Sequence, residues 1–122
     1  MVEANAVNGG HNYMVAVDGS DASELAFNIA MKGLFRPVKD QFNVCTITDG
    51  KKDYLPFIYK PEYIEEKYQA KIWKNVQAGN ATFVKKELDE DKTTKETLWA
   101  LTQAYNADIL VTGMHGRKGP KA

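Results

Sequence analysis

The sequence predicts a three-layer α/β/α domain, in which one parallel sheet lies between two layers of helices. Four short apolar runs rich in β-branched residues are expected to form the strands, at residues 13–17, 42–47, 81–88 and 108–112. Amphipathic segments with helix-capping residues alternate with these runs. Because regular alternation of strands and helices is typical of doubly wound folds, we expect a sheet of about four parallel strands.

Length and composition are consistent with one domain that needs no disulfide or structural metal. The 122 residues are enough to bury a substantial core, and 16 Lys and Arg balance 16 Asp and Glu. A net charge of zero gives no reason to expect nucleic acid as a partner. Cys45 is the only cysteine, so an internal disulfide is excluded. His11 and His115 are the only histidines, and together with one cysteine they are too few to build a zinc site. We expect Cys45 to be a buried bystander in a reducing compartment.

The N-terminal segment 1–12 lacks the basic and long apolar regions of a signal peptide, and we interpret it as a flexible lead-in to a domain spanning 13–122. No apolar run approaches the length of a membrane span, and neither end carries a lipidation motif. The sequence therefore predicts a soluble, cytoplasmic protein that does not associate with membranes.

The first strand, 13–17, is a continuous apolar run, as expected of a strand buried on both faces. The turn 18–20 breaks it, and Asp21 is expected to start a helix with Glu24 as its capping-box partner. Gly33 is the expected C-terminal stop. The side chains predicted for the core face of this helix are Leu25, Ala26, Ile29 and Ala30.

The second strand, 42–47, should lie parallel to the first, because a strand–helix–strand unit of this length crosses over right-handed. The stretch from Asp49 to Pro61 is expected to be a long loop. A helix from 62 to 77 should follow and end at Gly79. Its predicted helical stripe is Ile64, Tyr68, Ile72 and Val76.

The third strand, 81–88, becomes charged toward its end, which favours a position at the sheet edge. Thr93 and Glu96 form a capping box that opens the next helix. The fourth strand is expected at 108–112. The predicted stripe of the helix before it is Leu98, Leu101, Thr102 and Tyr105, and we expect Trp73, Trp99, Tyr63 and Tyr68 to lie in the core, with Trp99 also a candidate for a partner interface.

The candidate site lies where two polar turns follow neighbouring strands. In doubly wound sheets, ligands bind beyond the carboxyl ends of strands where the winding direction reverses. The turns 18–20 and 113–116 follow the first and fourth strands, which are the expected neighbours there. The run Gly113-Met-His-Gly-Arg-Lys118 offers backbone N–H groups and two cations, which suit an anionic ligand.

At this point the residues resemble a known family, the universal stress proteins. Segment 15–26 is similar to the family's first strand, turn and helix start, and segment 107–116 to its fourth strand and phosphate turn. The resemblance implies an adenine nucleotide alpha hydrolase-like, Rossmann-like fold with strand order 3-2-1-4. In the ATP-binding branch the phosphate motif is G-x2-G-x9-G-[ST], and Gly113 with Gly116 match its first half.

The second half of that motif would fall past Ala122, and the family's fifth strand would follow it. The sequence therefore predicts a universal stress protein domain that is incomplete at its C-terminus. Because the fifth strand helps to form the dimer in many relatives, its absence affects both the phosphate site and the usual assembly. We still expect a homodimer, since the fourth strand would expose an apolar edge.

Carried over by position, the resemblance implies an ATP site without catalytic residues. Ala16, Val17 and Asp18 would border adenine and ribose, and Ile47 would cover the adenine face. Backbone amides of the turn Gly113, Met114, His115 and Gly116 would meet the phosphates, with Thr112 beneath them. Asp18 is also placed to hold a water on Mg²⁺. No catalytic constellation can be assembled near these turns, so at most slow ATP hydrolysis is expected.

Each of these residues also has a structural interpretation. Asp18 also suits an Asx turn that caps the following helix. Gly113 and Gly116 suit a turn that requires positive φ, and His115 suits a solvent-exposed loop. The alternative function is therefore a protein–protein interaction module of the same fold that binds no nucleotide. A flavodoxin-like redox module fits less well, because no Ser/Thr-rich phosphate loop follows the first strand.

Overall fold

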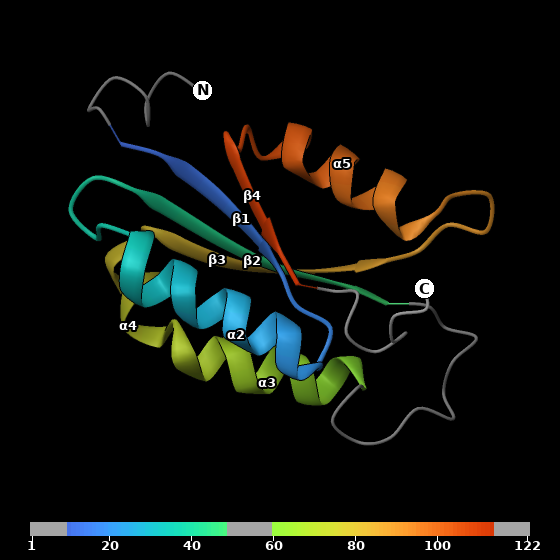
Figure 1. Ribbon diagram of the computed structural model, residues 1–122, viewed down its shortest axis with the longest axis horizontal. Coiled ribbons are helices and arrows are strands. Elements are labelled where there is room, and N and C mark those ends of the chain that lie inside the picture. The colour runs from blue at the N-terminus through green and yellow to red at the C-terminus, as the bar shows by residue number, and fades with distance from the viewer. Residues whose placement is uncertain (1–9, 49–59, 114–122) are drawn as a thin grey trace.

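The computed structural model describes residues 10–48 and 60–113. Its centre is a four-stranded parallel sheet with the order β3-β2-β1-β4, which confirms the predicted topology (Figure 1). The strands are β1 (Asn12–Ala16), β2 (Gln41–Thr48), β3 (Ala81–Glu87) and β4 (Ile109–Thr112). β1 starts one residue before its predicted boundary, and residues 1–9 of the expected flexible segment lie outside the described part.

Helices cover both faces of this sheet, which confirms the three-layer architecture. One face carries α2 (Asp21–Ile29), the π-helical turn η1 (Ala30–Leu34), α3 (Pro61–Lys71) and α4 (Trp73–Ala78), and the other carries α5 (Thr94–Ala104) (Figure 1). The chain steps from β1 to β2 to β3 in one direction and then returns across them to β4. Right-handed crossovers in opposite directions place their helices on opposite faces.

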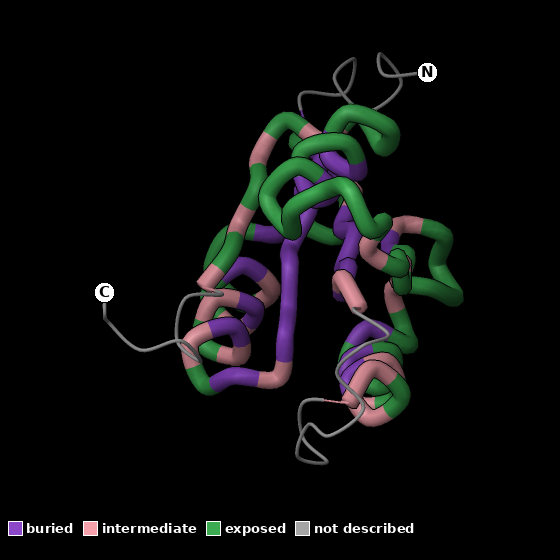
Figure 2. Tube along the Cα trace, turned by 90° about the vertical axis from the view of Figure 1, so that its right-hand side faces the viewer, coloured by how far each residue is buried: buried purple, intermediate pink, exposed green. Residues whose placement is uncertain are grey.

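The two faces bury two separate apolar clusters, and β1 contributes to both because successive strand residues alternate between faces. Tyr13, Val15 and Val17 lie in the larger cluster beneath α2 and α3, whereas Met14 and Ala16 lie in the smaller cluster beneath α5. All of β1 is buried, as its uninterrupted apolar sequence predicted, and buried residues gather along the middle of the molecule (Figure 2).

The predicted core face of the first helix is wrong for Leu25 and Ile29 and right for Ala30, while Ala26 is half-buried. Leu25 and Ile29 are 61% and 54% exposed, and the buried residues of α2 and the following turn are Ser23, Phe27 and Ala30. Phe27 decides this orientation, because its ring makes edge contacts with Phe42 and Tyr68 at centroid distances of 5.8 and 4.9 Å. Burying one phenylalanine between aromatic neighbours outweighs burial of the aliphatic stripe.

The capping of this helix also differs from the prediction. Ser20 is the N-cap residue, and its hydroxyl oxygen accepts a hydrogen bond from the backbone N–H of Ser23 at 3.1 Å. A capping box needs its acidic partner three residues after the N-cap, and Glu24 stands four residues after Ser20. Its carboxylate instead binds the ammonium group of Lys67 on α3 at 2.9 Å, and this hydrogen bond is the main reason why the pKa of Glu24 lies below its ordinary value.

Gly33 does not end the first helix, contrary to prediction. The helix continues through η1 to Leu34, and the backbone N–H of Phe35 closes it by donating to Ala30 at 2.8 Å. Gly33 has no left-handed φ. The wide turn brings Phe35 into the core, with its ring centroid 4.8 Å from that of Phe42.

The predictions for the remaining helices are largely confirmed. The long helix divides into α3 and α4 at Ile72, and Gly79 ends it with a left-handed φ of 87°. Thr93 and Glu96 form the predicted capping box at α5. Trp73 and Trp99 are exposed, so their core assignment is wrong. Val76 and Tyr105 are also partly exposed, while Ile64, Tyr68, Ile72, Leu98, Leu101 and Thr102 are buried.

The described residues contain no helix that is both long and apolar enough to cross a membrane. Most of the predicted loop, residues 49–59, lies outside the described part.

Candidate functional site

The carboxyl ends of β1 and β4 lie side by side, as the sequence predicted. In the parallel register between these strands, Ala16 is the partner of Thr112. The turn that begins at Asp18 and the chain at Gly113 therefore leave the same edge of the sheet. The winding direction reverses between β1 and β4, so this edge is the topological switch point at which doubly wound folds bind their ligands.

Asp18 is buried and holds the turn that leads into α2. Its Oδ1 accepts hydrogen bonds from the backbone N–H of Ser20 at 3.0 Å and from the Ser20 hydroxyl at 2.6 Å. Gly19 between them has a left-handed φ of 88°. The carboxylate thus forms the Asx-type turn that the sequence left as an alternative. Both contacts use Oδ1, so Oδ2 is the oxygen relevant to a ligand.

Ser23 fastens this turn to the helix. Its hydroxyl donates to the backbone carbonyl of Ser20 at 3.1 Å and accepts a hydrogen bond from the backbone N–H of Asp18 at 3.2 Å. Ser23 is completely buried. Sequence reasoning assigned no role to Ser20 or Ser23. A Ser directly before the acidic first turn of a helix is the N-cap signal that would have identified Ser20.

Tyr68 lies buried on α3 near this turn, and sequence reasoning placed it only in the core. Burial raises the pKa of Tyr68 to about 12, with further raising contributions from the charges of Glu24 and Asp18 and an opposing one from the Ser23 hydroxyl. The phenol therefore stays neutral at physiological pH. The turn that contains Asp18 and Ser23 thus lies near a buried, neutral tyrosine from the neighbouring helix α3.

Gly113 approaches the first turn of α2 so closely that no side chain fits. A Cβ atom built at Gly113 would lie 2.4 Å from the carbonyl oxygen of Ala22. Its φ is not left-handed, so the interpretation of Gly113 as a positive-φ turn glycine is wrong. The close backbone approach keeps the ends of β4 and the α2 turn together at the candidate site.

Replacing Gly113 with alanine is therefore expected to destabilise the protein by about 1–3 kcal/mol, because backbone rather than a flexible side chain must move. Urea unfolding followed by circular dichroism measures this change. Gly33→Ala is the matched control, since a Cβ there meets nothing within 4 Å. Equal stability of the two variants would contradict this account of Gly113.

The remaining predicted site residues are distributed over both faces of the sheet. Ala16 and Ile47 contribute to the cluster beneath α5, whereas Val17 lies in the cluster beneath α2. Thr112 is exposed at the end of β4. Met114, His115 and Gly116, which complete the predicted phosphate turn, lie outside the described residues. The structure thus brings together Ala16, Asp18, Thr112 and Gly113, with Ile47 at the end of the adjoining strand.

Cys45 supplies no reactive group to this site, although it packs beside Ala16 and Ile47. It is fully buried in β2, and burial raises the pKa of its thiol to about 12. A thiol with that pKa is not a nucleophile at neutral pH, which confirms its assignment as a buried bystander.

A parallel sheet with a polar turn at its topological switch point defines a doubly wound α/β protein of the class that includes nucleotide-binding domains. The chain belongs to the universal stress protein family, whose family model matches residues 11–122. It is also similar to a solved protein of that family from Burkholderia pseudomallei, with 22% sequence identity and a TM-score of 0.61 over 86% of this chain and 82% of the other. No curated protein sequence matches the chain significantly.

Proposed function

We propose that this stress-response protein binds ATP at the edge of the sheet where the carboxyl ends of β1 and β4 lie side by side. Membership of the universal stress protein family supports the stress-response class. The pairing of Ala16 with Thr112 is the observation that carries the ATP proposal, because it places a buried carboxylate and a close-packed glycine at the switch point. The proposed setting is the cytoplasm.

Within this proposal each residue has a distinct role. Asp18 would use Oδ2 to accept from a ribose hydroxyl or to hold a water on Mg²⁺, while Oδ1 keeps the turn with Ser20. Ala16, Val17 and Ile47 would border the adenine, and Gly113 would offer its backbone N–H to phosphate. The N-terminus of α2, directly behind Asp18, favours negative charge. The proposed role is regulatory, with at most slow hydrolysis.

Thermal unfolding with and without saturating Mg-ATP tests the proposal, with GTP as the specificity control. A ligand present at about 100 times its dissociation constant and bound only to the folded chain adds roughly 2.7 kcal/mol, so the midpoint should rise by several degrees. Asp18→Asn keeps an oxygen acceptor for Ser20 and removes the charge, so it should fold and show a smaller ATP shift. The absence of an ATP-specific shift in the wild-type chain would contradict ATP binding.

The second candidate function is an interaction module of the same fold that binds no nucleotide. The large exposed apolar side chains Leu25 and Ile29 on α2 and Leu110 on β4 favour it, because exposed apolar surface is typical of sites that contact another protein. It predicts that ATP leaves the unfolding midpoint unchanged while the midpoint rises with protein concentration.

A further inference from the structure

We propose that the hydroxyl of Tyr68 is a positioning group for the turn 18–20, and that it donates a hydrogen bond to Ser23 Oγ when a nucleotide is bound at Asp18. Because the site is that of the proposed function, this role rests on nucleotide binding there. The observation behind it is a buried polar atom on α3 to which the structure gives no hydrogen bond.

The hydroxyl oxygen of Tyr68 is completely buried, and it has no hydrogen-bond partner within residues 10–48 and 60–113. A buried hydroxyl without a partner costs free energy, because it has given up its hydrogen bonds to water. Phenylalanine would fill the same position on α3 without that cost. Packing of the ring alone therefore does not account for a tyrosine at this position.

The phenol of Tyr68 faces the first turn of α2. Its ring makes an edge contact with Phe27 at a centroid distance of 4.9 Å, and Phe27 follows Ser23 by four residues, so both lie on the same buried face of α2. Burial is the main cause of the raised pKa of Tyr68, and Ser23 and Asp18 are among the smaller contributions. Both groups therefore lie near the phenol, which connects α3 with the turn that carries Asp18.

The Ser23 hydroxyl can accept one more hydrogen bond. A serine hydroxyl offers one donor and two acceptor positions. Ser23 donates to the Ser20 carbonyl at 3.1 Å and accepts from the Asp18 backbone N–H at 3.2 Å, which leaves one acceptor position among the described contacts. The Tyr68 hydroxyl is protonated at neutral pH, because its pKa is about 12. It is thus a donor without an acceptor, close to an oxygen that can accept.

The turn is the part that can move to close this contact. Helix α3 lies beside α2 and is held there by the ion pair of Lys67 with Glu24 at 2.9 Å (Figure 1). The turn contains Gly19, whose left-handed φ of 88° is accessible to glycine without steric cost. Because the backbone N–H of Asp18 donates to Ser23 Oγ, a small movement of the turn at Asp18 is passed directly to Ser23.

A nucleotide at Asp18 is expected to bias the turn toward Tyr68. Its contacts with Oδ2 exist only in the bound state, and they compensate for a small movement that brings Ser23 Oγ within reach of the phenol. The Tyr68 hydroxyl then has an acceptor, so the cost of burying it in the free protein is recovered on binding. The hydroxyl therefore adds to nucleotide affinity and adds nothing to the stability of the free protein.

The stability of the free protein is the first test. Tyr68→Phe should leave the urea midpoint unchanged or raise it, because it removes a hydroxyl that has no hydrogen bond. Tyr13→Phe is the matched control. Tyr13 is also buried, but its hydroxyl donates to the Leu34 carbonyl at 3.4 Å, so this variant should lower the midpoint. A clear fall in the midpoint of Tyr68→Phe would overturn the inference, because the hydroxyl would then be bonded in the free protein.

Isothermal titration calorimetry with Mg-ATP is the second test. Tyr68→Phe should weaken binding by about threefold to tenfold in Kd, as expected for one hydrogen bond, while Tyr13→Phe should bind like the wild type. Equal Kd values for wild type and Tyr68→Phe would overturn the role of Tyr68 and leave ATP binding intact. A wild-type chain that binds no Mg-ATP would overturn the proposed function, and the role of Tyr68 with it.

A double-mutant cycle tests the route through Ser23. In a Ser23→Ala background the acceptor is gone, so Tyr68→Phe should cause no further loss of Mg-ATP affinity. Circular dichroism establishes that all variants are folded. An undiminished effect of Tyr68→Phe in that background would overturn the hydrogen bond to Ser23.

Discussion

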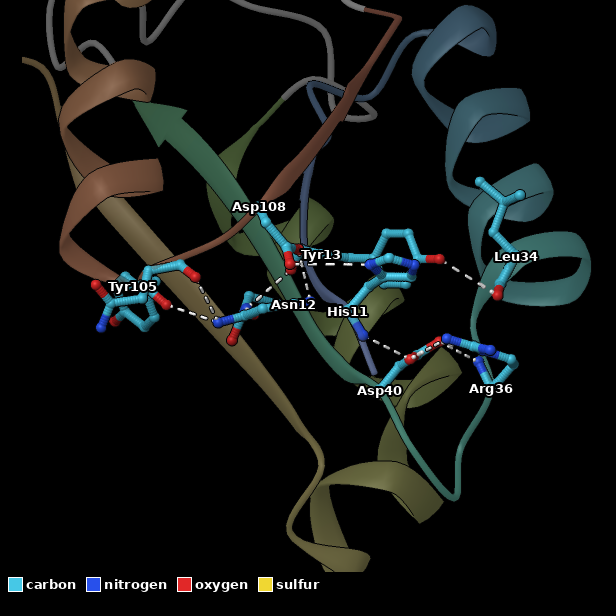
Figure 3. A network of polar contacts seen from close by, with 10 residues as sticks. His11, Asn12, Tyr13, Leu34, Arg36, Asp40, Tyr105 and Asp108 are labelled. Carbon is cyan, nitrogen blue, oxygen red and sulfur yellow. Dashed lines mark hydrogen bonds and ion pairs between the residues drawn. The ribbon is translucent and has the colours of Figure 1, made fainter. Parts of the chain in front are cut away.

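Replacing Asp40 with alanine is expected to lower the free energy of unfolding by about 3 kcal/mol, one of the two largest effects predicted for this protein. The side chain of Asp40 is fully buried at the amino end of the sheet (Figure 3). Its Oδ1 accepts from the His11 backbone N–H at 2.8 Å, and its Oδ2 accepts from the Arg36 backbone N–H at 2.8 Å. The Arg36 guanidinium adds contacts at 3.1 and 3.2 Å. Alanine would leave these donors without their acceptor.

This contribution should depend on pH in a defined direction. Burial by itself would raise the pKa of Asp40, but hydrogen bonds from Arg36 and from the backbone of His11 outweigh burial and hold the pKa below its ordinary value of 3.8. A lowered native pKa stabilises the fold fully above the unfolded value, and the stabilisation is lost as the pH falls through the native value.

Urea unfolding at pH 7 and at a series of acidic pH values measures both effects. The difference in stability between wild type and Asp40→Ala should be largest at neutral pH and shrink as the pH falls below about 4. Asp40→Asn is the control that keeps oxygen and shape but removes the charge, so its loss should be intermediate. A difference that stays constant down to the lowest pH would show that the carboxylate charge has no part in it.

Asn43→Ala should also destabilise the protein by roughly 2–4 kcal/mol, because it breaks a buried polar ladder across three strands. The Asn43 amide donates to Oδ1 of Asn12 at 2.6 Å and to the backbone carbonyl of Tyr13 at 2.8 Å. Its Oδ1 accepts from the Thr82 hydroxyl at 2.7 Å. Asn12 in turn donates to the backbone carbonyls of Tyr105 and Asn106 after α5 (Figure 3). The ladder thus links β3, β2, β1 and the end of α5.

A graded series of variants separates this ladder from simple loss of packing. Thr82→Val removes one donor and should cost about 1 kcal/mol, clearly less than Asn43→Ala. Urea unfolding gives the free energies, and one fixed protein concentration for all variants keeps any concentration-dependent contribution from self-association comparable between them. If Asn43→Ala were as stable as the wild type, the ladder would contribute nothing to stability.

Both networks were invisible to sequence reasoning for the same physical reason. Asn12 was assigned to a flexible lead-in, and Asn43 stands within an apolar strand pattern that carries no information about partners. Asp40 lies between predicted elements. Asn12 and Asn43 gain their roles from residues far along the chain, as in the contact of Asn12 with Tyr105, and Asp40 joins its near neighbour Arg36 to the distant His11. Local periodicity does not report such pairings.

The candidate site was predicted in part. The sequence located Asp18 and Gly113 because each follows a strand, and the switch-point rule brought them together. The structural roles of Asp18 and Gly113, however, depend on the residues that surround them in the folded protein. Asp18 forms the Asx turn with Ser20, and Gly113 is glycine because of the carbonyl of Ala22, not because of its own φ. No sequence pattern identified the buried Ser23, whose hydroxyl holds the turn to α2.

The sequence by itself determined the α/β architecture and the ends of several helices, because these follow from local hydrophobic periodicity and capping residues. The strand order came from the resemblance to the universal stress proteins, and the structure confirms it. Only the tertiary structure decided the rotation of α2 about its axis, where Phe27 displaces Leu25 and Ile29 from the core. An amphipathic pattern states that one side of a helix is buried. Which of two apolar stripes faces the sheet is decided by the shapes of the side chains that meet there.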